Sequence, residues 1–209
     1  MTVAAIIKRV REYLDEVEAV NYTEVLNGSV PINDRIRSLI PECALYLSNG
    51  REMDDSITST LTVDAEGMGT MEVPEDFGRL YEMRLSCWKR SVYDVVGIDS
   101  TLYAKQKSIA TRGGTCRPVV AITPYNEGRR FELYSIPVWD KSVKVERAAY
   151  IPVADVGSDD ANIDVDARKE ALLCYMIAVR AARTYGNEAA VKLLGASLAE
   201  EQQKISLTK

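Results

Sequence analysis

The 209-residue sequence predicts an α+β protein, because apolar residues at helical spacing mark both ends of the chain and short strands mark its middle. We expect an N-terminal helix pair, a β-rich middle of short antiparallel strands and a C-terminal Ala-rich helical hairpin. Hydrophobic residues make up 46% of the chain and charged residues 27%, as in ordinary globular proteins. The sequence has no histidine, so it lacks the side chain that most often acts as a general base.

Two amphipathic helices are expected at the N-terminus. Residues 3–17 carry apolar side chains at helical spacing, and Thr2 can cap them. A second helix follows an N-cap at residues 33–34, and Pro41 should kink or restart it. The Asn-Gly pair at 49–50 supplies a left-handed stop.

The middle of the chain predicts strands separated by turn residues. A short helix should follow Asp99 as its N-cap. The turn at 64–67 and the turn at 125–128 each join two of the strands. The expected strands cover residues 60–63, 70–73, a run from 80 to 88, 119–122, 130–133 and 143–150.

The C-terminal region predicts two helices that pack closely. The acidic segment 155–166 resembles a linker, and Asp166 can cap the helix that follows it. Gly186 should end that helix and Asn187 should cap the next one. Alanines and Gly195 favour a close approach of the two helices. We expect one connector-type domain over residues 1–209, in which helical parts 1–50 and 166–206 pack together around a β-rich insertion of about 58–152.

Composition also predicts the cellular compartment. The sequence has no 18-residue apolar run, so no membrane contact is expected. The first residues are apolar and the charges follow, which reverses the order of a signal peptide and predicts synthesis in the cytoplasm. The four cysteines are scattered and should be reduced.

Charge is unevenly distributed along the chain. The net charge is −5, yet residues 79–147 hold 13 Lys and Arg against 7 Asp and Glu. This basic stretch could face an anionic partner or an acidic surface of another copy, although an unevenly charged solvated surface explains it equally well. The candidate interface residues in it are Trp88, Lys89, Arg90, Arg112, Arg117, Arg129 and Arg130.

No pattern for catalysis, cofactor binding or metal binding is found. The sequence has neither a phosphate-binding GxxxxGK[ST] loop nor a GxGxxG loop after a strand. An apparent calcium loop at 160–171 has Val165 in place of glycine and Ala171 in place of glutamate. We expect no enzyme, no cofactor and no metal; a carboxylate–metal site built from distant segments stays open, but no residue is nominated for it.

The order of elements and four short motifs resemble the head–tail connector (adaptor or ring) proteins of tailed bacteriophages, of the short-tailed or crAss-like type. The motifs are VPEDFGRL at 73–80, LSCWKRSV at 85–92, TRGG with RPVV at 111–120, and YGN at 185–187. The resemblance implies a non-enzymatic virion protein that forms a dodecameric ring. Its partners would be the portal protein, other ring or tail proteins, and genomic DNA that passes through the lumen without sequence-specific binding.

The basic middle leaves two alternatives open. It could act as a nucleic-acid-binding module, for which the overall negative charge is a weakness. The chain could also be a tail-completion or neck protein at another level of the particle. Neither the host, the ring level, the copy number nor the loops that face the lumen can be read from the sequence.

Overall fold

A computed structural model describes residues 1–15, 31–126, 128–140 and 142–207, and it divides the chain into two compact units. The helical unit consists of Met1–Asn49 and Val153–Lys209, and the β-rich unit consists of Gly50–Pro152. The expected α+β class is confirmed. The description of the chain as one connector-type domain stays a prediction. None of the described helices is both long and apolar enough to cross a membrane.

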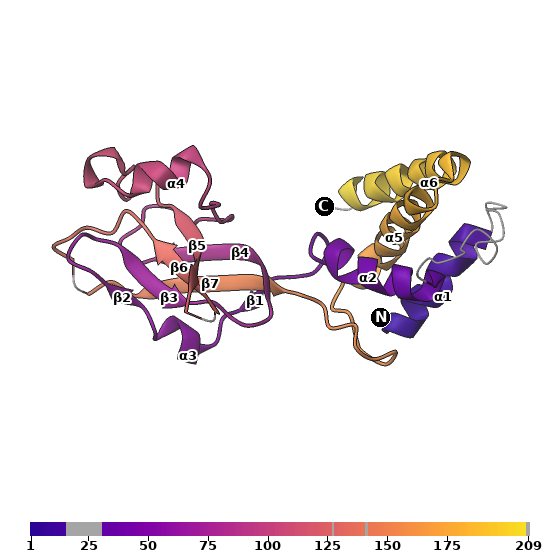
Figure 1. Ribbon diagram of the computed structural model, residues 1–209, viewed down its shortest axis with the longest axis horizontal. Coiled ribbons are helices and arrows are strands. Elements are labelled where there is room, and N and C mark those ends of the chain that lie inside the picture. Colours follow the sequence, from indigo (N-terminus) through magenta and orange to yellow (C-terminus); the bar gives the residue numbers. More distant parts are fainter. Residues whose placement is uncertain (16–30, 127, 141, 208–209) are drawn as a thin grey trace. The chain divides into compact units, whose positions relative to one another are not determined.

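The helical unit is built around its third helix. Helices α1 and α2 each pack against α5, and α5 also packs against α6 (Figure 1). This arrangement follows from the sequence, because α5 has buried residues around most of its circumference while α1 buries one face. The helices of this unit are α1 (Val3–Asp15), α2 (Ile32–Ala44), α5 (Glu170–Thr184) and α6 (Glu188–Leu207). Residues 16–17, the expected end of the first helix, lie outside the described residues.

Alanines are buried in both helices of the C-terminal hairpin. Ala178, Ala181 and Ala182 of α5 are fully buried, and Ala190 of α6 is 1% exposed. Gly195 does not take part, because a Cβ atom built there would meet nothing within 4 Å. The expectation that Gly195 serves the helix contact is therefore wrong.

The helix ends agree with the sequence at the C-terminus and differ at α2. The Asp166 side chain accepts a hydrogen bond from the Arg168 N–H and caps a 3-10 turn before α5. Gly186 has a φ of +70°, and the Asn187 side chain accepts from the Ala190 N–H, as predicted. Helix α2 begins at Ile32, before the expected caps at residues 33–34, because Pro31 already sets its backbone for entry into the helix.

The β-rich unit contains two antiparallel sheets with strand orders β1-β7-β4 and β2-β3-β6-β5. The predicted β5–β6 hairpin is confirmed, whereas β1 was not predicted because it has only two residues. In the turn between β2 and β3, Gly67 has a φ of +73°. The strands are β1 (Arg51–Glu52), β2 (Thr62–Val63), β3 (Gly69–Glu72), β4 (Phe77–Leu85), β5 (Val120–Tyr125), β6 (Gly128–Leu133) and β7 (Val145–Pro152).

One apolar core lies between the two sheets. The Phe77 ring of β4 meets the Phe131 ring of β6 edge to face, with 5.3 Å between the ring centroids. It also stacks on the Tyr150 ring of β7, with 5.8 Å between the centroids. Trp88 is 2% exposed and belongs to this core. Trp88 was expected to be an interface residue, but the fold of the unit uses it as a core residue.

The remaining helices of the unit are short: α3 (Asp55–Thr58), α4 (Thr101–Gln106) and a 3-10 turn at Ile109–Thr111. Helix α4 lies over the four-stranded sheet near β5 (Figure 1). Its Tyr103 packs in a small apolar cluster with Val119, Ala121 and Tyr134. Ser100 caps α4 by accepting from the Tyr103 N–H at 3.1 Å, so the expectation of an Asp99 cap is wrong by one residue.

Candidate interaction surface of the β-rich unit

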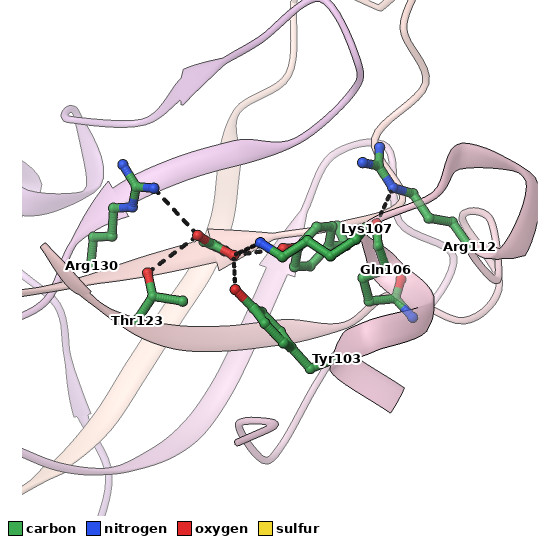
Figure 2. Close-up of polar contacts among 8 residues, drawn as sticks. Tyr103, Gln106, Lys107, Arg112, Thr123 and Arg130 are labelled. Carbon is green, nitrogen blue, oxygen red and sulfur yellow. Dashed lines mark hydrogen bonds and ion pairs between the residues drawn. The ribbon is translucent and has the colours of Figure 1, made fainter. Parts of the chain in front are cut away.

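A buried carboxylate organises the basic part of the β-rich unit. Glu132 lies on β6 and is 3% exposed. A buried carboxylate is tolerated only where charged or hydrogen-bonding partners replace its water. Four of those partners are labelled in Figure 2: Tyr103 of α4, Lys107 directly after α4, Thr123 of β5 and Arg130 of β6.

Five side chains satisfy this carboxylate. The Tyr134 and Tyr103 hydroxyls donate to Oε2 at 2.6 and 3.0 Å. The Thr123 hydroxyl donates to Oε1 at 3.2 Å. The Lys107 ammonium and the Arg130 guanidinium form ion pairs with the two oxygens, each at 3.3 Å.

The protonation states of the cluster follow from these contacts. Burial alone would raise the pKa of Glu132, but hydrogen bonds from Tyr134 and Tyr103 and the charge of Lys107 outweigh it and lower the pKa. Burial, and next its bond to this carboxylate, raises the pKa of the Tyr134 hydroxyl. The cluster therefore holds Glu132 as a carboxylate and Tyr134 as a neutral phenol at neutral pH.

Three of the expected interface arginines, Arg112, Arg129 and Arg130, form hydrogen bonds or ion pairs with other residues of the β-rich unit. Arg112 donates to the backbone oxygen of Gln106 (Figure 2). It also donates to the backbone oxygen of Glu66, and its guanidinium lies 5.4 Å from the Tyr134 ring centroid. Arg130 pairs with Glu132 and also stacks over a tyrosine ring.

Arg129 is also engaged, but more weakly. It donates to the Phe77 carbonyl at 3.3 Å and lies over the Phe77 ring. These three arginines contact other parts of the β-rich unit. Substitutions at them would therefore change the stability of the unit as well as any contact with another molecule.

The other expected basic residues are free. Lys89, Arg90 and Arg117 are exposed, and their side chains form no hydrogen bond or ion pair with any other residue that the structure describes. Long cationic side chains without internal partners are available to an anionic group on another molecule. The candidate surface therefore narrows from seven residues to these three.

An open cleft of about 730 Å³ lies beside these free cations. Arg90 and Arg117 line it, together with apolar residues that include Val92, Leu102 and Pro118. Its only buried polar side chain among the described lining residues is Gln106, which is 2% exposed. The cleft thus joins an apolar lining to a basic rim.

The charge asymmetry differs from the one expected between the helical ends and the middle. The basic stretch 79–147 is only part of the β-rich unit, because residues 52–76 of the same unit carry eight acidic residues. The β-rich unit has a net charge of −1 and the helical unit −4. The separation of charge therefore lies mainly within the β-rich unit, between its first strands and the rest.

The described carboxylates and cysteines do not gather into a cluster of metal ligands. Within residues 1–15, 31–126, 128–140 and 142–207, no group of three or more His, Cys, Asp or Glu side chains could hold a metal ion. Cys43 and Cys174 are free and buried, and burial raises the pKa of their thiols to about 11 and about 12.

The comparison with known families decides the class of this protein. The model of the SU10 adaptor protein family matches residues 1–207. The chain belongs to this family of phage head–tail adaptors. The SU10-type adaptor is therefore a virion structural protein, and its family is not an enzyme class. No curated protein matches the sequence.

Two features of the surface were missed from the sequence. Glu132 was counted only as one acidic residue in a basic stretch, because an isolated Glu in a strand gives no signal of burial. Trp139 is 80% exposed, and it was not singled out. Its position between Pro137 and Asp140, outside any strand pattern, was the available signal.

Proposed function

We propose that this adaptor assembles into a closed ring between the portal protein and the tail, and that DNA passes through the lumen of the ring. The observation that carries the proposal is the family match over residues 1–207. The ring, the dodecameric copy number, the portal contact and the DNA passage go beyond that match. The free basic rim and the acidic stretch 52–76 support the ring, because a cyclic assembly needs two unlike surfaces on every copy.

In this proposal the three free cations contact an acidic surface of the neighbouring copy. The chain offers such a surface in residues 52–76, where Asp54, Asp55 and Glu72 are exposed. Opposite charges at the rim of an interface accelerate and orient association more than they tighten it. Ring formation should therefore depend on salt concentration.

The ring contact is tested by charge reversal at the free cations. Arg90→Glu combined with Arg117→Glu should abolish self-association at low salt, measured by sedimentation velocity on the concentrated chain and by electron microscopy of particles. Lys8→Glu combined with Arg11→Glu on α1 is the matched control, because it makes the same change of charge at two exposed positions. Equal assembly of both double variants would contradict the role of the basic rim.

Placement in the virion is tested separately by quantitative mass spectrometry of purified particles. A ratio of one copy to each portal subunit is expected for a ring that shares the portal's symmetry. Absence of the chain from particles would contradict the whole proposal. The alternative of a nucleic-acid-binding module predicts DNA affinity that falls steeply with added salt in a filter-binding assay.

A further inference from the structure

We propose that the Trp139 side chain of one copy inserts into the Gln106 cleft of the next copy and is the central apolar contact of the ring. The Gln106 cleft is the cavity of about 730 Å³ lined by residues between 90 and 120. The proposal rests on the ring proposed above. It adds the two surfaces that meet and the residues that recognise each other.

The first observation is the exposure of Trp139. Its side chain is 80% exposed, and the neighbouring Val138 is 52% exposed. Both belong to the segment between β6 and β7. Burying an indole removes about 150–250 Å² of surface from water, and tryptophan is among the residues that dominate binding energy at interfaces. A tryptophan this exposed therefore indicates a surface that becomes covered.

The second observation is an unpaired buried acceptor on Gln106, a residue that lines the cleft. The Nε2 of Gln106 donates to the Leu102 carbonyl at 3.2 Å, while its Oε1 is buried and has no hydrogen-bond partner among the described residues. An unsatisfied buried acceptor carries a free-energy cost, because it has lost water without gaining another hydrogen-bond donor. A partner that brings a donor into the cleft would recover that cost.

Trp139 matches the cleft in shape and in chemistry. The indole has a large apolar body and a single N–H donor. The lining of the cleft includes apolar residues such as Val92, Leu102 and Pro118, and among its described residues Gln106 has a buried acceptor without a partner. Cavities of about 300–1,000 Å³ accept ligands larger than one indole, so the cleft has room for Trp139. An indole N–H bonded to Gln106 Oε1 would satisfy both groups.

Charge complementarity favours a second copy of this chain as the occupant. Asp140 follows Trp139 directly, and its carboxylate accepts only from Ser142 within the described residues. Arg90, Lys105 and Arg117 surround the cleft with three positive charges against one from Asp94. An inserted Trp139 therefore brings a carboxylate to a basic rim.

This contact is heterologous, because it joins two different surfaces of the same chain. Each copy offers one Trp139 and one cleft, so every copy can bind a neighbour on each side. Such contacts close into a ring when the rotation between copies divides a full turn. The proposed pair thus meets the geometric requirement of an adaptor ring.

The pairing is tested by disulfide cross-linking in phage particles. The chain would carry Cys116→Ser, to remove the exposed native thiol, together with Trp139→Cys and Leu102→Cys. Mild oxidation should give a ladder of cross-linked copies on a non-reducing denaturing gel. The matched control keeps Cys116→Ser and Leu102→Cys but carries Leu193→Cys in place of Trp139→Cys. Leu193 lies on α6 and is 57% exposed.

The outcomes separate this inference from the ring proposal. A ladder from the Trp139 pair and none from the Leu193 control supports both. Particles that contain the chain but give no ladder, or the same ladder from both variants, overturn the Trp139 contact and leave the adaptor role standing. Particles that lack the wild-type chain overturn the ring proposal and this inference with it.

A measurement on the wild-type chain covers the case in which the cysteine variants fail to assemble. Hydroxyl-radical oxidation of Trp139 and of Tyr93, which lines the cleft and is 61% exposed, should fall several-fold between the isolated chain and particles. Trp88 should show little oxidation in both samples. Unchanged oxidation of Trp139 overturns the proposal, and so does protection of Trp139 without Tyr93, which would indicate a different partner.

Gln106→Leu distinguishes recognition from a structural role. The variant removes the unpaired acceptor, so the thermal stability of the isolated chain should stay the same or rise. Self-association at a given concentration should nevertheless fall several-fold, because the indole N–H then enters the cleft without an acceptor. Unchanged self-association of Gln106→Leu would overturn the hydrogen bond assigned here.

Discussion

The helical unit and the β-rich unit are held together by different kinds of core. All buried polar or charged residues among those described lie in the β-rich unit: Gln106, Thr123, Glu132 and Ser135. The core of the helical unit consists of aliphatic residues, alanines and two cysteines. An apolar core is not directional, whereas a buried carboxylate must meet its partners at fixed distances.

This difference shows how one chain can combine a tolerant part with a specific part. The helical unit can repack after small apolar changes, because volume and pattern decide its stability. The β-rich unit places Lys107, Arg130 and α4 through Glu132, and it also carries the free basic rim and the exposed Trp139. We therefore expect the precise geometry of assembly to depend on the β-rich unit.

The largest effect is expected at Glu132. Glu132→Ala leaves the hydroxyls of Tyr103, Thr123 and Tyr134 without their shared acceptor, while Lys107 and Arg130 stay in contact with solvent. It should lower the free energy of unfolding by about 2–4 kcal/mol, mainly through the unpaired hydroxyls. Urea denaturation measures this loss, and hydrogen exchange should locate it in β5 and β6. The comparison variant Leu173→Ala, at a fully buried site of α5, should destabilise the helical unit instead. A loss below about 1 kcal/mol for Glu132→Ala would contradict the organising role of the carboxylate.

The next largest effect separates two glycines with left-handed backbones. Gly67→Ala in the β-rich unit places a Cβ atom 2.2 Å from the Ile136 carbonyl oxygen, in addition to the strain of a φ of +73°. Gly186 also has a left-handed backbone, with a φ of +70°, but a Cβ atom added there would meet no atom within 4 Å. Gly186→Ala should therefore lower the free energy of unfolding only by the backbone strain, about 1–2 kcal/mol. Thermal denaturation of both variants should show the larger loss for Gly67→Ala. Equal losses would mean that the backbone at Ile136 moves freely.

The two units should lose stability at different acidic pH values, because their carboxylates titrate differently. The folded-state pKa of Glu132 lies below its ordinary value of 4.5, so its stabilisation is present above pH 4.5 and is lost as the pH falls below it. Hydrogen bonds from the Arg168 side chain and backbone lower the pKa of Asp166 in the helical unit to about 2, so that contribution is complete above pH 3.8 and starts to fall only below that pH, being lost by about pH 2. Hydrogen exchange at decreasing pH should therefore show β6 opening before the start of α5.

The matched variant for the acid experiment is Glu132→Gln. It keeps the shape of the side chain and removes the titrating proton site, so the acid sensitivity of β6 should disappear while its stability at neutral pH is already reduced. Persistent acid sensitivity in Glu132→Gln would assign the effect to another carboxylate.

The smallest effects are expected at exposed ion pairs, where the two units should behave alike. Arg84 and Glu146 pair at 2.9 Å on the β-rich unit, and Arg180 pairs with Glu42 on the helical unit. Solvent screens both pairs, so Arg84→Ala and Arg180→Ala should each lower the free energy of unfolding by about 0.2–1 kcal/mol. A much larger loss for either one would show that its unit depends on surface charge, and urea denaturation measures it.

Local patterns in the sequence determined the elements of this protein and the ends of several of them. The α+β class, the β5–β6 hairpin and the caps at Asp166 and Asn187 follow from hydrophobic period and from side chains that bond a few residues away. Misplaced ends arose where a neighbouring residue served equally well, as at Pro31 and Ser100. The resemblance to phage connectors also came from local motifs, and the family match confirms it.

Only the tertiary structure decided which charged and aromatic residues are available to a partner. Of the two tryptophans, Trp88 is 2% exposed and Trp139 is 80% exposed. Arg130 and Arg117 are equally basic, but Arg130 is paired with Glu132 and Arg117 is free within the described chain. Burial and pairing depend on strands that meet from distant parts of the chain, and no local pattern records those contacts.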